Sequence, residues 1–361
     1  MSTPPEKAAS ALTPPGAKAD RRSSFDLGEL ASVCAHYDVG DIRRVLEYRK
    51  GSRRSPKVLL DTSTGRYLLK RRARGRDDPY RVAFCHDLQL YLAASGFPAT
   101  RLIGTRLGNN SMVQLGDRVY ELFEYVEGEP FDRTATPCEH AGALLARLHA
   151  LARDYHPRWP APAWSYHDDQ AVRVRLGQIV DRGIAAPEAG ELRRVYDAAA
   201  ALAAPPKGRK RPRVQLLHGD WHPGNMIFRD RRVAAVVDFD GARTGPVAPD
   251  VATGALQFAL TRVGLDADAW PDALDAERFA AFLRGYGSAG EAVDPKLLPP
   301  LMTESLIAEV AAPVALTGSF GGLPPDPFVR MVLRKSRWLL RHADKLAALG
   351  ARSLVHPGPA H

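Results

Sequence analysis

Three oxygen-bearing side chains follow one another at short spacing in the second half of the chain. Asp220 lies in the segment His-Gly-Asp-Trp-His-Pro-Gly-Asn (218–225), which ends at Asn225, and Asp238 follows the apolar run 233–237. Mg²⁺ prefers hard oxygen ligands and usually takes only one or two carboxylates from a protein. Asn225 and Asp238 fit that demand, which leaves Asp220 to orient an acceptor hydroxyl or take its proton. The pattern predicts nucleotide-dependent phosphoryl transfer, where positioning and charge neutralisation do most of the catalysis.

Short apolar runs are expected to hold these side chains. Residues 214–217 and 233–237 are apolar, partly β-branched and flanked by turn formers, so they predict two strands separated by a compact loop. Within the loop, residues 226–228 predict a further strand, with a hairpin turn at 229–232. Pro223-Gly224 would let the chain curl Asn225 toward the metal. The plainer alternative, that Asp220 and Asp238 are ordinary loop acids, does not explain the combined pattern.

Together the two motifs resemble the catalytic core of the aminoglycoside phosphotransferase and choline kinase superfamily, which includes homoserine kinase of the second type and related spore-coat proteins. The resemblance implies an α+β, two-lobed protein-kinase-like fold, with a small antiparallel N-lobe sheet and a larger, mainly helical C-lobe. It implies Asp220 as the catalytic aspartate and Asn225 and Asp238 as Mg²⁺ ligands. His218 would brace the catalytic loop.

Two further acids follow the motif. Asp240 is either a helper near the metal or a solvated loop acid. Asp250 matches a family aspartate that caps the next helix and bonds to the catalytic loop. Its cap role has independent support, because the apolar residues after it recur at helical spacing.

The upstream region should contain a grip for the nucleotide. Three strands are expected at residues 45–48, 57–61 and 66–70. Gly51 and Ser52 would lie in the loop over the phosphates, where backbone N–H groups approach closely. Lys70 ends the third strand, where the family places the lysine that binds the α and β phosphates of ATP. A strand beginning at Arg118 would lead into the hinge, and the resemblance implies that the Glu124 carbonyl and the Val126 N–H pair with adenine.

The acidic partner of Lys70 is not visible. In the family a glutamate on the next helix holds this lysine, but the helix expected over 79–95 contains none. Asp87 is the nearest candidate; otherwise Asp77 or Asp78 substitutes, or the ion pair is absent. Many cations lie close to Lys70 in the sequence. They either contact phosphate or form a solvated basic surface. They are Arg53, Arg54, Lys57, Arg71, Arg72, Arg74 and Arg76.

Length and composition suit a globular enzyme. With 361 residues, 45% of them hydrophobic and 25% charged, the chain can bury one large or two moderate cores. We expect a flexible tail over 1–25, an N-lobe over 26–125 beginning with a helix near 28–36, a C-lobe over 126–350, and a tail over 351–361.

The same composition argues against several other classes. Three scattered cysteines without a CxxC pair support neither a disulfide framework nor a zinc site. The first residues lack an apolar signal region, and no stretch approaches the ~18 apolar residues that cross a bilayer. We therefore expect a cytoplasmic protein with no membrane partner, and its oligomeric state stays open.

The rival functions rest on two features. The basic run 205–213 and a formal net charge of +9 can attract nucleic acid, but no aromatic residues interleave the run, which disfavours a nucleic-acid-binding module. The missing helix glutamate keeps open a catalytically weak or inactive, structural or regulatory kinase-like protein. The intact motif favours an active enzyme.

The resemblance implies that the acceptor is a small-molecule hydroxyl on an amino alcohol, a homoserine-like compound, an aminoglycoside or a sugar. The patterns Tyr-Asp-Val-Gly (37–40) and Gly-x-Tyr-x-Leu-Lys (65–70) resemble the homoserine kinase and spore-coat branch most. Four C-lobe side chains are candidates for the acceptor pocket or for purely structural roles: Trp164, Glu304, Glu309 and Trp338.

Overall fold

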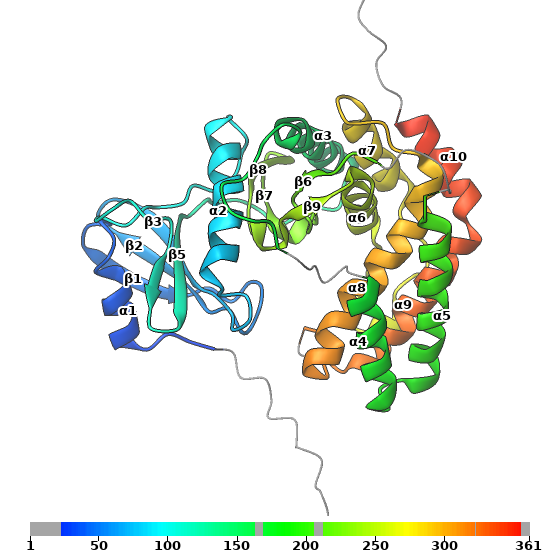
Figure 1. Cartoon of the computed structure of the whole chain (residues 1–361), viewed down its shortest axis with the longest axis horizontal. Coiled ribbons are helices and arrows are strands. Elements are labelled where there is room, and N and C mark those ends of the chain that lie inside the picture. Colours follow the sequence, from blue (N-terminus) through cyan, green and yellow to red (C-terminus); the bar gives the residue numbers. More distant parts are fainter. Residues whose placement is uncertain (1–22, 163–168, 206–211, 322, 355–361) are drawn as a thin grey trace, which may run out of the picture.

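The chain forms two lobes that are joined through a short linker and a long helix (Figure 1). The computed structural model describes residues 23–162, 169–205, 212–321 and 323–354. One lobe is built on an antiparallel sheet and the other is mainly helical. The two-lobed α+β expectation is therefore confirmed.

The first lobe is a five-stranded sheet with one small helix against it. The strand order is β1-β2-β3-β5-β4, and every neighbouring pair is antiparallel. Buried apolar side chains from the sheet and the helix, among them Val33, Leu60 and Leu122, form a separate small core. The elements are α1 (Leu27–Cys34), β1 (Ile42–Glu47), β2 (Lys57–Thr62), β3 (Arg66–Arg71), β4 (Val113–Leu115) and β5 (Arg118–Glu124).

Helix α2 (Pro79–Ala94) connects the two cores. It begins where expected, because Asp78 accepts a hydrogen bond from the Arg81 N–H at 2.8 Å and Pro79 occupies the first turn, where no donor is needed. The buried side chains of α2, such as Phe84 and Leu88, belong to the larger core of the second lobe. Figure 1 shows the helix between the sheet and the rest of the protein.

The second lobe is a helical body around that larger core. The helices are α3 (Ala135–Ala152), α4 (Asp169–Asp181), α5 (Ala186–Ala203), α6 (Val247–Ala259), α7 (Ala276–Gly287), α8 (Leu298–Thr317), α9 (Pro325–Arg341) and α10 (Ala343–Ser353), with short 3₁₀ turns at Pro223–Asn225, Phe239–Gly241, Ala267–Ala269 and Pro295–Leu297. Helices α3 and α7 are in backbone contact at two glycines. A Cβ on Gly142 would lie 2.0 Å from the Phe282 carbonyl oxygen, and a Cβ on Gly285 would lie 1.9 Å from the Glu139 carbonyl oxygen.

Two small antiparallel ribbons lie where the lobes meet. The expected hairpin is present, and its two turn residues Asp230 and Arg231 have φ of 50° and 59°, the conformation of a turn that matches the twist of the strands. The second ribbon brings a short strand before the catalytic motif against one after it. The pairs are β7 (Met226–Arg229) with β8 (Arg232–Val236), and β6 (Gln215–Leu217) with β9 (Arg243–Gly245).

One helix is more apolar than expected, since no stretch was expected to be apolar enough to cross a bilayer. Among the described residues, Pro295–Thr317 is long and apolar enough to cross a membrane, but 67% of its most apolar window is buried inside the protein. Most of α8 packs into the larger core, with side chains such as Leu306 and Val310. The apolarity of this helix is thus accounted for by internal packing.

Candidate active site

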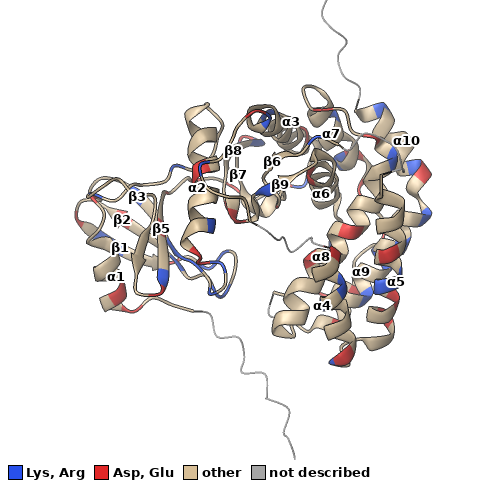
Figure 2. Cartoon of the chain, viewed as in Figure 1, with Lys and Arg blue, Asp and Glu red and all other residues tan. Residues whose placement is uncertain are grey.

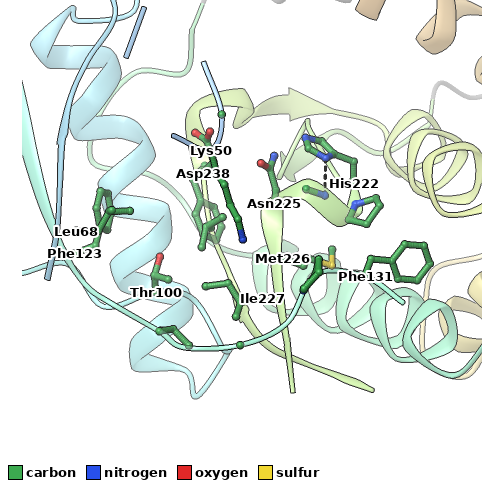
Figure 3. A pocket seen from close by; sticks show the side chains of 18 of the residues that line it. Lys50, Leu68, Thr100, Phe123, Phe131, His222, Asn225, Met226, Ile227 and Asp238 are labelled. Atoms are coloured by element: carbon green, nitrogen blue, oxygen red, sulfur yellow. Dashed lines mark hydrogen bonds between the residues drawn. The ribbon is translucent and has the colours of Figure 1, made fainter. Parts of the chain in front are cut away.

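A cavity of about 550 Å³ lies between the lobes. It brings together residues that are far apart in the sequence, from the β1–β2 loop, β3, the linker after β5 and the loop that follows β6 (Figure 3). Of the predicted site residues, the cavity is lined by Gly51, Lys70, Glu124, Val126, Asn225 and Asp238. Ser52 is not among its lining residues. Asp220 joins the site through Asn225, whose Nδ2 donates to the Asp220 carbonyl and to its Oδ2, both at 3.0 Å.

The catalytic loop folds tightly because of one glycine. Gly219 has φ of +74°, and a Cβ there would lie 2.0 Å from the Gly241 carbonyl oxygen. Any other residue would both strain the backbone and push the two loops apart. The close approach of Gly219 and Gly241 therefore sets the separation between the loop that carries Asp220 and the loop that carries Asp238.

Asp250 holds this loop from below. Its carboxylate accepts from the His218 N–H at 3.1 Å and from the Gly219 N–H at 3.0 Å. The expected bond to the catalytic loop is confirmed, but the expected helix cap is wrong, because Asp250 lies inside α6 and Pro246 stands at the cap position. Pro249 does not stop the helix from starting earlier, since the N–H groups of a first turn have no helical partner.

Sequence reasoning missed the residues that hold Asp250. His149 on α3 lies with Nε2 3.3 Å from the Asp250 Oδ2, and its Nδ1 is 3.0 Å from the Tyr286 hydroxyl. Burial opposes ionisation of Asp250, but the hydrogen bond and charge of His149 outweigh it and lower the pKa of the carboxyl. Neither His149 nor Tyr286 belongs to a motif, so only the tertiary contact reveals them.

His218 is buried rather than a solvated loop residue. Its ring packs against Trp221 and Phe239, with ring centroids 5.2 Å and 4.8 Å away. Burial lowers the pKa of His218, which favours the neutral imidazole. This packing agrees with the bracing role, which stays a prediction.

Asp220 lies beside a second histidine of the motif. The His222 Nε2 is 3.6 Å from the Asp220 Oδ2. Burial would raise the pKa of Asp220, but His222 outweighs this and holds that pKa well below its usual range. Burial lowers the pKa of His222, but the charge and hydrogen bond of Asp220, together with the charges of Glu309 and Asp238, raise it overall. Asp220 is thus ionised at neutral pH, as a residue that orients or deprotonates a hydroxyl must be.

Lys70 lies in a buried cluster of charges. It is 6% exposed, and its Nζ is 3.0 Å from Asp240, 3.4 Å from Asp238 and 3.6 Å from Glu121. Arg72 joins the same carboxylates, at 2.6 Å from Glu121 and 2.8 Å from Asp240. The alternative of a solvated Asp240 is therefore wrong, and its side chain is only 14% exposed.

All the sequence-based candidates for the partner of Lys70 are wrong. Asp87 instead accepts from the Tyr155 hydroxyl at 2.6 Å and from the Arg158 N–H at 2.8 Å. Asp78 caps α2, and Asp77 accepts from the Gly75 N–H at 2.9 Å. The ion pair is not absent either.

The sheet register supplies the acid that α2 lacks. Lys70 on β3 lies directly opposite Glu121 on β5, and side chains of directly opposed residues point to the same face. Helix α2 contributes His86, whose Nε2 is 2.6 Å from the Glu121 Oε1. A glutamate inside the apolar run 119–123 was a signal that a buried cation must face it, because a buried charge is rarely tolerated without a partner.

Asp238 has an unusual backbone. Its φ is +61°, in the left-handed region that non-glycine residues rarely adopt. Burial opposes its ionisation, but the charges of Lys70, Lys57 and Arg72 favour it, and the pKa of Asp238 is lowered to about 2. A strained residue that presents an ionised carboxylate to a cavity is typical of a functional site.

The oxygen donors around Asp238 suit a hard cation whose remaining coordination positions are filled by a bound ligand. The Asn225 amide nitrogen is committed to Asp220, which leaves its Oδ1 as a potential ligand next to the Asp238 carboxylate. Among the described residues, no group of three or more His, Cys, Asp or Glu side chains could hold a metal by itself. A cation here would take only two ligands from the protein, as Mg²⁺ does with substrate phosphates.

The cations around Lys70 fall into separate groups. Arg71 pairs with Glu29 at 2.6 Å and Arg74 with Asp117 at 2.5 Å, while Arg72 belongs to the buried cluster. Lys50 and Lys57 line the cavity, and Figure 2 shows cations along the loop between β1 and β2. The remaining three, Arg53, Arg54 and Arg76, are exposed and do not line it.

Apolar side chains line one end of the cavity, which we call the apolar slot. Leu68 and Phe123 lie on the N-lobe side, and Met226 and Ile227 lie on the C-lobe side (Figure 3). The linker that carries Glu124 and Val126 borders the slot and is tied to β7, because the Glu129 N–H donates to the Phe228 carbonyl at 2.7 Å.

The acceptor-pocket candidates separate in the structure. Glu309 accepts a hydrogen bond from Gln257, which lines the cavity; burial, with the charge of Asp220, raises the pKa of Glu309 to about 7. Glu304 does not line the cavity, and burial raises its pKa to about 7. Trp338 stacks on His342 with centroids 4.5 Å apart. Trp164 lies outside the described residues.

Comparison with known proteins places this geometry in a family. The family model described as "Phosphotransferase enzyme family" matches residues 46–296. Homoserine kinase of Acidiphilium cryptum is 28% identical over 288 residues, which span 75% of this chain and 81% of that one.

Solved structures share the fold at low identity. The structure of a microcompartment-associated aminopropanol kinase has a TM-score of 0.68 at 18% identity and covers 89% of this chain and 99% of its own. An amicoumacin kinase in complex with AMP-PNP and Ca²⁺ has a TM-score of 0.62 at 15% identity, covering 92% and 95%.

Proposed function

The chain belongs to the phosphotransferase enzyme family and is a small-molecule kinase, and on this premise we propose that it transfers the γ-phosphoryl group of ATP to the hydroxyl of a small, homoserine-like acceptor with the help of Mg²⁺. The juxtaposition of Asp220, Asn225 and Asp238 at one cavity carries the proposal. The homoserine kinases among the relatives support the acceptor class, and the AMP-PNP and Ca²⁺ bound to the amicoumacin kinase support a nucleotide and a divalent cation.

The nucleotide is proposed to enter with its base in the apolar slot. Backbone groups of Glu124 and Val126 in the adjoining linker are available for the adenine edge, as in the family. Lys70 would hold the α and β phosphates, and Gly51, with φ of +82°, would let its loop approach them. Ser52 stays a candidate of that loop, but it has no support from the cavity lining. The lobe boundary is proposed at residues 125 and 126, where β5 has ended.

Asn225 and Asp238 are the proposed ligands of Mg²⁺. When bound, the ion neutralises charge on the β and γ phosphates. Asp220, ionised beside His222, accepts a hydrogen bond from the acceptor hydroxyl, aligns its oxygen for attack on phosphorus and takes up its proton. Asn225 fixes the Asp220 carboxylate through its amide, so one side chain would serve both the metal and the base.

A non-catalytic kinase-like protein is the second candidate, and its main support was the missing helix glutamate. Glu121 now provides Lys70 with a buried acid from β5, which removes that support. A nucleic-acid-binding module rests on the basic run 205–213, and residues 206–211 of it lie outside the described part of the chain.

The test is an Asp220→Asn variant assayed with ATP and a panel of homoserine, amino alcohols, aminoglycosides and sugars. Turnover should fall by about 10² or more, because the hydroxyl loses its base and aligner, while ATP binding by calorimetry should persist. Unchanged turnover would falsify the role of Asp220. Absence of turnover in the wild type with every acceptor would favour the non-catalytic candidate.

A further inference from the structure

The end of the cavity away from the apolar slot is not used by the proposed nucleotide site. Figure 3 shows Phe131 and His222 at this end, away from Leu68 and Phe123. His222 approaches Asp220, so this is the side from which a hydroxyl can reach the catalytic aspartate. We call it the acceptor end and define it by Phe131, Arg133, His222, Gln257, Leu260 and Arg262, all of which line the cavity.

Two arginines stand next to each other at the acceptor end. The Arg133 Nη1 donates to the Arg262 carbonyl oxygen at 3.4 Å, and the Arg262 guanidinium lies 5.4 Å from the centre of the Trp270 ring. Both residues are exposed, and neither forms an ion pair with a carboxylate anywhere in the described part of the chain. Their donors therefore remain accessible from the cavity.

A third arginine that lines the cavity, Arg278, has the contacts expected of a structural residue. Arg278 is 6% exposed, donates to the carbonyl oxygens of Phe258 and Leu260 at 2.9 Å and 3.2 Å, and pairs with Asp275 at 3.1 Å. Arg133 and Arg262 lack such commitments. Hydrogen bonds and an ion pair account for Arg278, whereas Arg133 and Arg262 have no carboxylate partner among the described residues.

The pair is held together at an energetic cost. Two guanidinium groups repel each other: burial lowers the pKa of Arg262, and the charge of Arg133 lowers it further. Arg133 also has φ of +62°, a left-handed conformation that is unfavourable for a residue with a Cβ. An anion between the two cations would offset their repulsion.

A carboxyl group lies on the other side of the acceptor end. Glu309 accepts from Gln257, and its charge partly opposes the lowering of the Arg262 pKa by burial and by Arg133. The end of the cavity thus offers two cations in its lining and lies close to Asp220, which His222 approaches. A ligand with an anionic group and a hydroxyl matches these features.

Resting on the proposed function, we propose that Arg133 and Arg262 form an anion subsite that binds the carboxylate of the acceptor, so that the enzyme selects small hydroxy acids over alcohols without a carboxylate. A guanidinium group presents paired N–H donors that match the two oxygens of a carboxylate. The donor phosphates are already served by Lys70 and by the metal ligands.

Homoserine and 3-aminopropan-1-ol are suitable probes, because the second is the first without its carboxylate. The wild type should have the higher kcat/KM with homoserine. Arg262→Gln and Arg133→Gln should each lower the ratio of the two kcat/KM values by about tenfold to a hundredfold, the range for a lost charge-assisted hydrogen bond, through KM for homoserine rather than kcat. Arg262→Lys should restore part of the ratio, since it returns the charge.

The matched control is Arg341→Gln, an exposed arginine of α9 outside the cavity, which should leave the ratio unchanged. KM for ATP distinguishes the competing explanation: if the arginines contact phosphate, that KM rises and the ratio holds, which overturns the subsite. Equal kcat/KM for both acceptors in the wild type also overturns it while the kinase function stands.

A binding readout separates this proposal from the proposed function. If the wild type phosphorylates neither acceptor, the homoserine-like function is wrong, and calorimetry then decides the subsite alone. Homoserine binding that Arg262→Gln weakens and Arg341→Gln does not supports an anion subsite. Failure of homoserine to bind the wild type overturns it.

Discussion

Charges on the two sides of the cavity are arranged in opposite ways. On the nucleotide side, Lys70, Arg72 and Glu121 are almost completely buried and pair with one another or with Asp240. On the acceptor side, the arginines are exposed and form no carboxylate pair within the described residues. The same kind of side chain is therefore committed on one side and available on the other.

The difference follows from the cost of burial. A buried ion that lacks a partner costs several kcal/mol, so the nucleotide side must be paired before any ligand arrives. A partly exposed cation keeps part of its hydration and can stay unpaired until a ligand binds. On the proposed function, the nucleotide side would serve one constant donor, whereas single substitutions on the acceptor side would change selectivity with little loss of stability.

The largest effect should come from Glu121→Gln. The variant keeps the size of the side chain but leaves Lys70 and Arg72 short of one buried negative charge. We expect the free energy of unfolding to fall by about 3 kcal/mol, measured by urea denaturation. The control Glu47→Gln breaks an exposed pair with Arg49 and should cost at most about 1 kcal/mol. Equal losses in the two variants would show that burial does not distinguish the cluster.

The second-largest effect should be on nucleotide binding alone and should come from replacing Lys70. Lys70→Met should weaken ATP binding by about tenfold to a hundredfold, because a charge-assisted contact to phosphate is lost, while KM for the acceptor stays close to wild type. Titration with ATP and two-substrate kinetics measure both quantities. The control is Lys345→Met, which replaces an exposed lysine of α10. A rise in acceptor KM as large as the loss of ATP affinity would break the division between the two sides.

The smallest effect concerns Glu309. Its pKa is raised from 4.5 in the unfolded chain to about 7 in the fold, so between these values the folded protein binds more protons and its stability falls as pH rises. Glu309→Gln removes this dependence. The variant should gain stability over the wild type by on the order of 1 kcal/mol from pH 5 to pH 8, measured by urea denaturation across that range. A constant difference would mean that Glu309 titrates normally.

Local signals in the sequence were sufficient for the catalytic loop. The turn at 229–232, the strands on either side of it and the start of α2 all depend on neighbouring residues, such as Asp78 before Pro79, and the structure confirms them. The cap assigned to Asp250 was wrong because the local signal is ambiguous: Pro249 is compatible both with the start of a helix and with its first turn.

By itself the sequence determined the family and, through the family resemblance, the two-lobed fold and the three side chains proposed for phosphoryl transfer, because short motifs carry that resemblance. Only the tertiary structure decided which acid faces Lys70, what supports Asp250 and where Arg133 meets Arg262. Those contacts join residues whose separation along the chain carries no information about their distance. Sheet register and helix packing create them, and burial then decides which charges must pair with each other and which remain for a ligand.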